Sequence, residues 1–128
     1  MIIKIPISLG ELVDKISILL IKKEKIKDKK KLKFIIKELI ELQNKLNKID
    51  IKKNKIKKYL KDIKKINSKL WIIEDKIRKH EKNRKFDKKF IKLARSVYIN
   101  NDSRANIKSL INEEFGSNII EVKSYEKY

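Results

Sequence analysis

A row of apolar side chains, spaced alternately three and four residues apart, constrains the fold of this chain more than any other feature. The row consists of Ile56, Tyr59, Ile63, Ile66, Leu70, Ile73 and Ile77. This spacing places a narrow apolar stripe along one helix, and another helix must cover it. We predict a long helix over residues 55–82, paired with a helix over residues 30–47 in a coiled-coil-like helical hairpin. Pairing of two such stripes in a homodimer remains open.

Capping residues predict three further helices. Ser8 and Glu11 have the spacing at which a hydroxyl and a carboxylate satisfy the free amides at a helix start, so a helix is expected over residues 8–28. Asp87 is placed to cap a helix over residues 87–100.

After residue 100 a new start signal follows. Asp102 is placed to cap a last helix over residues 103–115, and Gly116 suits a left-handed C-terminal cap. The segments 1–7 and 118–125 are rich in β-branched residues, so we expect them to be extended. They either pair as a small β-ribbon or pack separately on the helices.

Together these elements predict a mainly α protein with a single domain over residues 1–128. It consists of a long helical hairpin plus two shorter C-terminal helices. The chain has no Cys and one His, so we predict no disulfide, no metal site and no cofactor. No apolar run approaches the roughly 20 residues that a membrane span needs, and a cytoplasmic protein is expected.

The formal net charge of +19 invites a nucleic-acid hypothesis. Residues 22–70 hold 20 lysines, no arginine and six acidic residues, so most of the excess lies there. Lys, Ile and Asn share AT-rich codons, and solvated helix surfaces accept lysine readily. We therefore interpret this excess as a solvated surface in an AT-rich background.

The arginines are distributed differently. All four follow the only tryptophan, Trp71, and lie among carboxylates. Arginine binds carboxylates and phosphates through a planar fork that lysine lacks. Two interpretations stay open: a structural arginine and carboxylate network, or an anion pocket. The predicted ligand-binding residues are Lys15, Glu74, Arg78, Arg95, Tyr98, Asn101, Asp102 and Arg104, and none is predicted to be catalytic.

Several stretches, taken in order, resemble an uncharacterised family of small bacterial and phage proteins. They run from Ile5 to Leu19, Leu70 to Arg78, Phe86 to Tyr98, Asn101 to Ala105 and Glu121 to Tyr125. The resemblance implies genes placed beside glycosyltransferase and other surface-polysaccharide genes. It implies no activity, cofactor or catalytic residue.

Three functions are weighed. The first is a non-catalytic accessory domain that binds an anionic small molecule or a partner protein in polysaccharide assembly. The second is a basic nucleic-acid-binding protein, although residues 22–70 offer no arginine and only Phe34 and Tyr59 as aromatic residues. The third is a small enzyme of the chorismate mutase type. It ranks last, because that chemistry uses several arginines and the first two helices have none.

Overall fold

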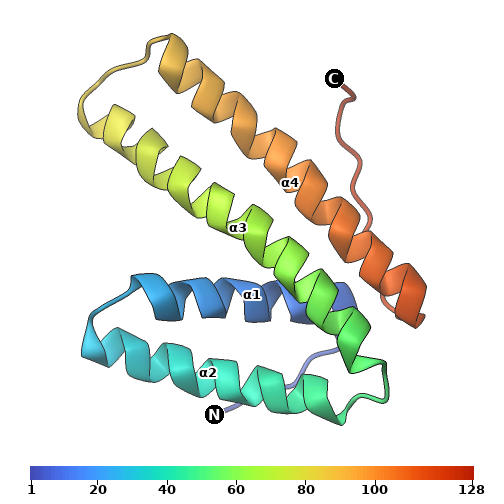
Figure 1. The fold of residues 1–128 in the computed structure, drawn as a ribbon. Helices are drawn as coiled ribbons and strands as arrows, with labels where there is room; N and C mark the ends of the chain where they lie inside the picture. The colour runs from blue at the N-terminus through green and yellow to red at the C-terminus, as the bar shows by residue number, and fades with distance from the viewer.

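The chain forms four helices and no strand. The computed structural model describes residues 1–128, with α1 at Leu9–Lys25, α2 at Lys29–Lys48, α3 at Lys53–Lys82 and α4 at Lys88–Phe115 (Figure 1). The mainly α fold class is therefore confirmed, and the predicted β-ribbon is wrong. None of the four helices combines the length and the apolar character needed to cross a bilayer.

The helices form two antiparallel hairpins that cross each other. α1 and α2 make one hairpin, α3 and α4 make the other, and α1 is the helix that contacts all three others (Figure 1). α2 packs on no helix other than α1. Beyond the crossing, the distal halves of α3 and α4 project as a two-helix hairpin (Figure 1).

The apolar core lies where the hairpins cross. It is centred on α1, where Val13 and Ile16 are fully buried, and is closed by Ile63 of α3 and Ile111 of α4. Further along α3, Ile73 and Ile77 continue the heptad stripe but are only half-buried. The stripe is thus covered on more sides near the crossing than in the projecting hairpin.

The partner predicted for this stripe is wrong. The helices expected over residues 30–47 and 55–82 do form, as α2 and α3, but they do not pack on each other. The short connection Ile26 to Asp28 folds α2 back onto α1 instead. The Lys53 ammonium caps the end of α2 by donating to the carbonyls of Leu46 at 3.0 Å and Ile49 at 2.9 Å.

The break expected between residues 100 and 103 is also wrong, because α4 is continuous through this region. Its polar side chains bond to carbonyls one turn back within the helix instead of ending it. Asn100 Nδ2 donates to the Ser96 carbonyl at 2.7 Å, and Ser96 Oγ donates to the Leu93 carbonyl at 2.6 Å. Asp102 is therefore an interior residue of α4.

The two terminal segments lie against different helices, which explains why they form no ribbon. Residues 2–9 line a cavity with α2, whereas the C-terminal tail runs back along α4 (Figure 1). The tail is held by Glu121, which pairs with Lys108, and by Tyr128, whose hydroxyl donates to Asp102.

Candidate functional site

α1 presents a row of small and polar residues to α3 and α4. Gly10, Asp14 and Ser17 are four and three residues apart, so they share one face of the helix, and all three are buried. A polar group on a buried face needs a hydrogen-bond partner. The partners come from α3 and α4.

Asp14 is fully buried and pairs with Arg104 of α4. Nε of Arg104 donates to Oδ1 of Asp14 at 2.9 Å, and Nη2 donates to Oδ2. Such two-pronged contacts are among the strongest that arginine makes with a carboxylate. The hydrogen bond raises the pKa of Arg104 above its ordinary value, so its guanidinium stays charged.

Asn67 of α3 also bonds to Asp14, so the carboxylate links three helices. Its Nδ2 donates to Asp14 Oδ1 at 2.8 Å and to Ser17 Oγ at 2.7 Å. The Ser17 hydroxyl in turn donates to the Asp14 carbonyl at 2.7 Å. No buried side-chain nitrogen or oxygen lacks a partner, so the polar cluster is fully satisfied.

Lys108 extends the cluster one turn further along α4. Its Nζ lies 2.7 Å from Glu11 Oε2 and 2.8 Å from Glu121 Oε2, and so joins α1, α4 and the tail. Burial alone would lower the pKa of Lys108, but its bonds to Glu11 and Glu121 outweigh this effect and the pKa is raised. The bond from Lys108 also lowers the pKa of Glu121.

The lowered pKa of Glu121 predicts release of the tail in acid. A carboxylate whose pKa is lower in the folded state stabilises that state fully above its unfolded pKa, and this contribution is lost as the pH falls through the folded pKa. We expect the tail to detach from α4 as the pH drops below about 4. NMR relaxation of the tail backbone, compared with residues in the middle of α4, measures this detachment. In Glu121→Gln the tail should be loose at every pH, and unchanged acid sensitivity in that variant would contradict the prediction.

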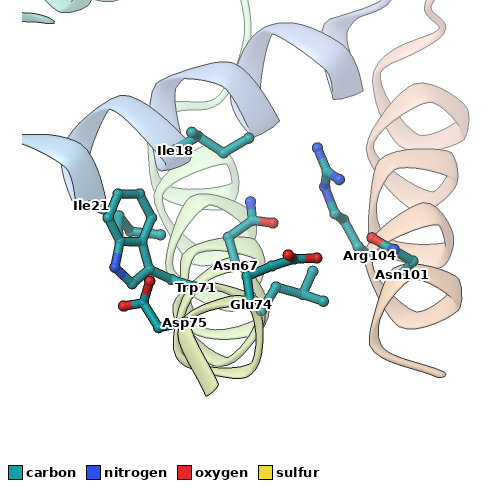
Figure 2. A pocket seen from close by; sticks show the side chains of 9 residues that line it. Ile18, Ile21, Asn67, Trp71, Glu74, Asp75, Asn101 and Arg104 are labelled. Carbon is teal, nitrogen blue, oxygen red and sulfur yellow. The ribbon is translucent and has the colours of Figure 1, made fainter. Parts of the chain in front are cut away.

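A cavity of about 420 Å³ opens beside the polar cluster, where α1 crosses α3 and α4 (Figure 2). Its lining residues are Ile18, Ile21, Asn67, Leu70, Trp71, Glu74, Asp75, Asn101 and Arg104. Trp71 and Ile21 lie on one side of it, and Arg104 and Asn101 lie on the other (Figure 2). This volume falls within the range of about 300–1,000 Å³ that small-molecule pockets occupy.

The polar groups of this pocket are mixed in charge. Glu74 and Asp75 bring two carboxylates, while the one cation, Arg104, is already paired with Asp14. The side chains of Asp75 and Asn101 make no hydrogen bond within the chain, so both are free to bind a ligand. No group of three or more His, Asp or Glu side chains is placed to hold a metal ion.

The structure brings three of the predicted ligand-binding residues together. Glu74, Asn101 and Arg104 line the pocket. Arg78 lies outside it, 80% exposed, with its Nε 3.7 Å from Glu74 Oε2. Arg95 is exposed on α4 nine residues before Arg104, or roughly 13 Å along the axis, and does not line the pocket.

The other three predicted residues lie elsewhere. Tyr98 and Asp102 hold the end of the tail: the Tyr98 and Tyr128 rings are 5.0 Å apart, and Asp102 accepts the Tyr128 hydroxyl. Lys15 is exposed and lines a second cavity of about 900 Å³ beside the N-terminal segment. The four cations proposed for an anion pocket therefore do not converge.

Several residues of the site were not predicted from the sequence. Asn67, Trp71 and Asp75 line the pocket, and Asp14 holds its arginine. One signal was available, since an aspartate and a serine interrupt the apolar face of the first helix at helical spacing. The residues that would meet them could not be named without knowing which helices pack there.

The fold and the cavity define a small all-helical protein made of two crossed hairpins, with a ligand-sized pocket at the crossing. The model of a family of unknown function, DUF6165, matches residues 3–128, and the chain belongs to this family. Searches of curated proteins and of solved structures found no match.

Proposed function

We propose that this protein is a non-catalytic binding module. Its ligand, a hydroxyl-rich compound such as a saccharide unit, would bind in the cavity where α1 crosses α3 and α4, which we call the Trp71 pocket. The observation that carries this proposal is the combination of one indole face with free hydrogen-bonding groups around a cavity of about 420 Å³. A sugar ring has an apolar face that packs on an indole, and hydroxyls around its edge.

The charges around the pocket favour a ligand that donates hydrogen bonds. The Glu74 and Asp75 carboxylates accept only, so a bare anion would face two like charges. Arg104, which would attract an anion, is already neutralised by Asp14. Hydroxyls both donate and accept, and therefore suit the carboxylates, the Asn101 amide and the remaining N–H groups of Arg104 together.

The proposal changes the ligand that the sequence suggests but keeps its context. An accessory role in surface-polysaccharide synthesis, in the cytoplasm of a bacterium or phage host, suits a saccharide-binding module. A pocket of the chorismate mutase type is not favoured, since Arg104 is the only arginine that lines the cavity. A partner protein remains a prediction of the sequence.

Trp71 is the only tryptophan, so its fluorescence reports directly on this pocket. Titration with a panel of neutral monosaccharides, sugar phosphates and nucleotide sugars should change the emission for at least one compound. Asn101→Ala and Asp75→Ala should each weaken that binding by about tenfold, because each variant loses one hydrogen bond to the ligand. The hydrogen bond to Asp75 involves a charged group, and such bonds are stronger.

Arg95→Ala is the matched control, because Arg95 is exposed on α4 outside the pocket. It should leave the affinity unchanged. A loss with Arg95→Ala as large as that with Asn101→Ala would favour the anion site predicted from the sequence. No change in emission across the whole panel would contradict the proposal.

A further inference from the structure

The outer face of α2 carries large apolar side chains that the fold does not use. Among the helices, α2 packs on α1 alone, through Ile35 and Leu39. On the exposed part of α2, Phe34 lies on one flank and is 75% exposed. Ile36, 39% exposed, and Ile40, 51% exposed, lie on the opposite flank, roughly 120–160° around the helix axis from Phe34. No other part of the chain covers these side chains, so their apolar surface stays in contact with water.

Lysines lie between these apolar side chains. Lys29 and Lys33 share a row with Ile36 and Ile40 at spacings of four, three and four residues, which lie on one helix face. Lys30 and Lys37 flank Phe34 in the neighbouring row at spacings of four and three. All four lysines are exposed, and none forms an ion pair.

The positive charge continues into the neighbouring turn. Between residues 22 and 37 there are nine lysines against two acidic residues. Both acids are engaged: Glu24 Oε1 lies 2.5 Å from Lys64 Nζ, and Asp28 accepts the Lys31 amide at 3.0 Å as the cap of α2. This end of the molecule therefore presents a cationic field with apolar side chains set into it.

We propose that the outer face of α2, defined by Lys29, Lys30, Lys33, Phe34, Ile36, Lys37 and Ile40, docks on the surface of an anionic lipid bilayer. A helix lying in a membrane interface needs apolar side chains that enter the acyl boundary and lysines that reach the anionic headgroups. This face has both, on a helix whose opposite side is fixed to the protein core. The inference does not depend on the ligand of the Trp71 pocket.

The same features disfavour two other occupants. A symmetric dimer through this face would bring the same lysines of two copies opposite each other, where they repel. Nucleic acid would attract the lysines, but it gives aliphatic side chains such as Ile36 and Ile40 no partner, and the face has no arginine for base edges. A bilayer satisfies both kinds of side chain.

The test is co-sedimentation of the full chain with vesicles, made either of phosphatidylcholine alone or of phosphatidylcholine with phosphatidylglycerol. We expect binding to the anionic vesicles only. The variant K30Q/K33Q/K37Q should reduce that binding by about 100-fold, at roughly fivefold for each lysine near the surface. The variant F34S/I40S should reduce it by at least about tenfold, because less apolar surface enters the interface.

A control removes the same charge elsewhere. Lys57, Lys61 and Lys65 are exposed on α3, form no ion pair and have no exposed large apolar side chain on the neighbouring turns. The variant K57Q/K61Q/K65Q should reduce vesicle binding by less than about fivefold, the effect of one lysine. All substituted side chains are exposed, and circular dichroism should show the same helix content in each variant.

Several results would overturn the proposal. Equal losses in the α2 and α3 lysine variants would make the attraction that of a general polycation, and unchanged binding of F34S/I40S would remove the apolar contact. A dimer in light scattering that dissociates in F34S/I40S would assign the face to a second copy. Stronger, α2-lysine-dependent binding to duplex DNA than to vesicles would assign it to nucleic acid. Failure to bind anionic vesicles would also contradict the proposal.

Discussion

Replacement of Asp14 by alanine should lower the free energy of unfolding by about 3 kcal/mol, the lower end of the range for breaking a buried ion pair. The variant leaves the Arg104 guanidinium without its carboxylate and takes one acceptor from Asn67. The lower end applies because the Arg104 side chain is 28% exposed, so water recovers part of the loss. Since small domains are stable by only about 5–15 kcal/mol, urea denaturation should show a large shift of the midpoint.

A double-mutant cycle with Arg104→Ala separates the ion pair from simple loss of packing. The double variant should lose less stability than the sum of the two single variants, by at least about 1 kcal/mol, because the second change removes a charge already stranded by the first. Glu24→Ala is the matched control on the same helix, since its ion pair with Lys64 is exposed. This control should leave the stability almost unchanged. In the cycle itself, losses at Asp14 and Arg104 that simply add would contradict the role assigned to their ion pair.

Gly10→Ala should destabilise the protein by about 3 kcal/mol, the upper end of the usual cost of overpacking, although a glycine-to-alanine change inside a helix normally stabilises it by about 1 kcal/mol. An alanine Cβ at this position would lie 2.6 Å from the Lys108 carbonyl oxygen and 3.0 Å from Asn112 Oδ1. α1 and α4 would have to move apart. That movement would also strain the bond from the Gly10 amide to Asn112, now 2.8 Å.

Two controls test this explanation by thermal or urea unfolding. Gly116→Ala meets no atom within 4 Å, but its φ of 66° is left-handed, so it should cost only about 1–2 kcal/mol. Asn112→Ala should not rescue Gly10→Ala, because the nearest obstacle is backbone. A Gly10→Ala protein as stable as the parent would show that the two helices are not held this close.

Local signals predicted much of the secondary structure. Ser8 accepts the Glu11 amide at 3.1 Å, Asp87 accepts the Phe90 amide at 3.0 Å, and Gly116 takes the left-handed cap. These contacts involve residues within a few positions of each other, so the sequence reports on them directly. The other half of the motif predicted at Ser8, in which the Glu11 carboxylate accepts a free amide at the helix start, does not form. The Glu11 carboxylate binds Lys108 instead.

The candidate site was only partly predictable for a related reason. Arg104 was identified because arginines among carboxylates are uncommon in a lysine-rich chain, and Asn101 was identified as a neighbour that could orient a ligand. Asn67 and Asp14 gain their importance from contacts across 53 and 90 positions of sequence. Arg95 and Arg78 have the same chemistry as Arg104, but both side chains are exposed and neither lines the pocket.

The sequence by itself determined the helical stretches that form α1 to α4, although it divided α4 into two helices. It also determined an apolar stripe on each buried face and the caps at several ends, because helix periodicity and capping depend on residues a few positions apart. It also indicated that the last part of the chain holds the informative polar residues. Only the tertiary structure decided that α4 and α1, and not α2, cover the stripe of α3. Any apolar helix face can cover such a stripe, and the choice rests on short connections and on the close fit of Gly10 against α4. That choice brings Trp71, Asn101 and Arg104 around one pocket and leaves the apolar and lysine side chains of α2 facing outward.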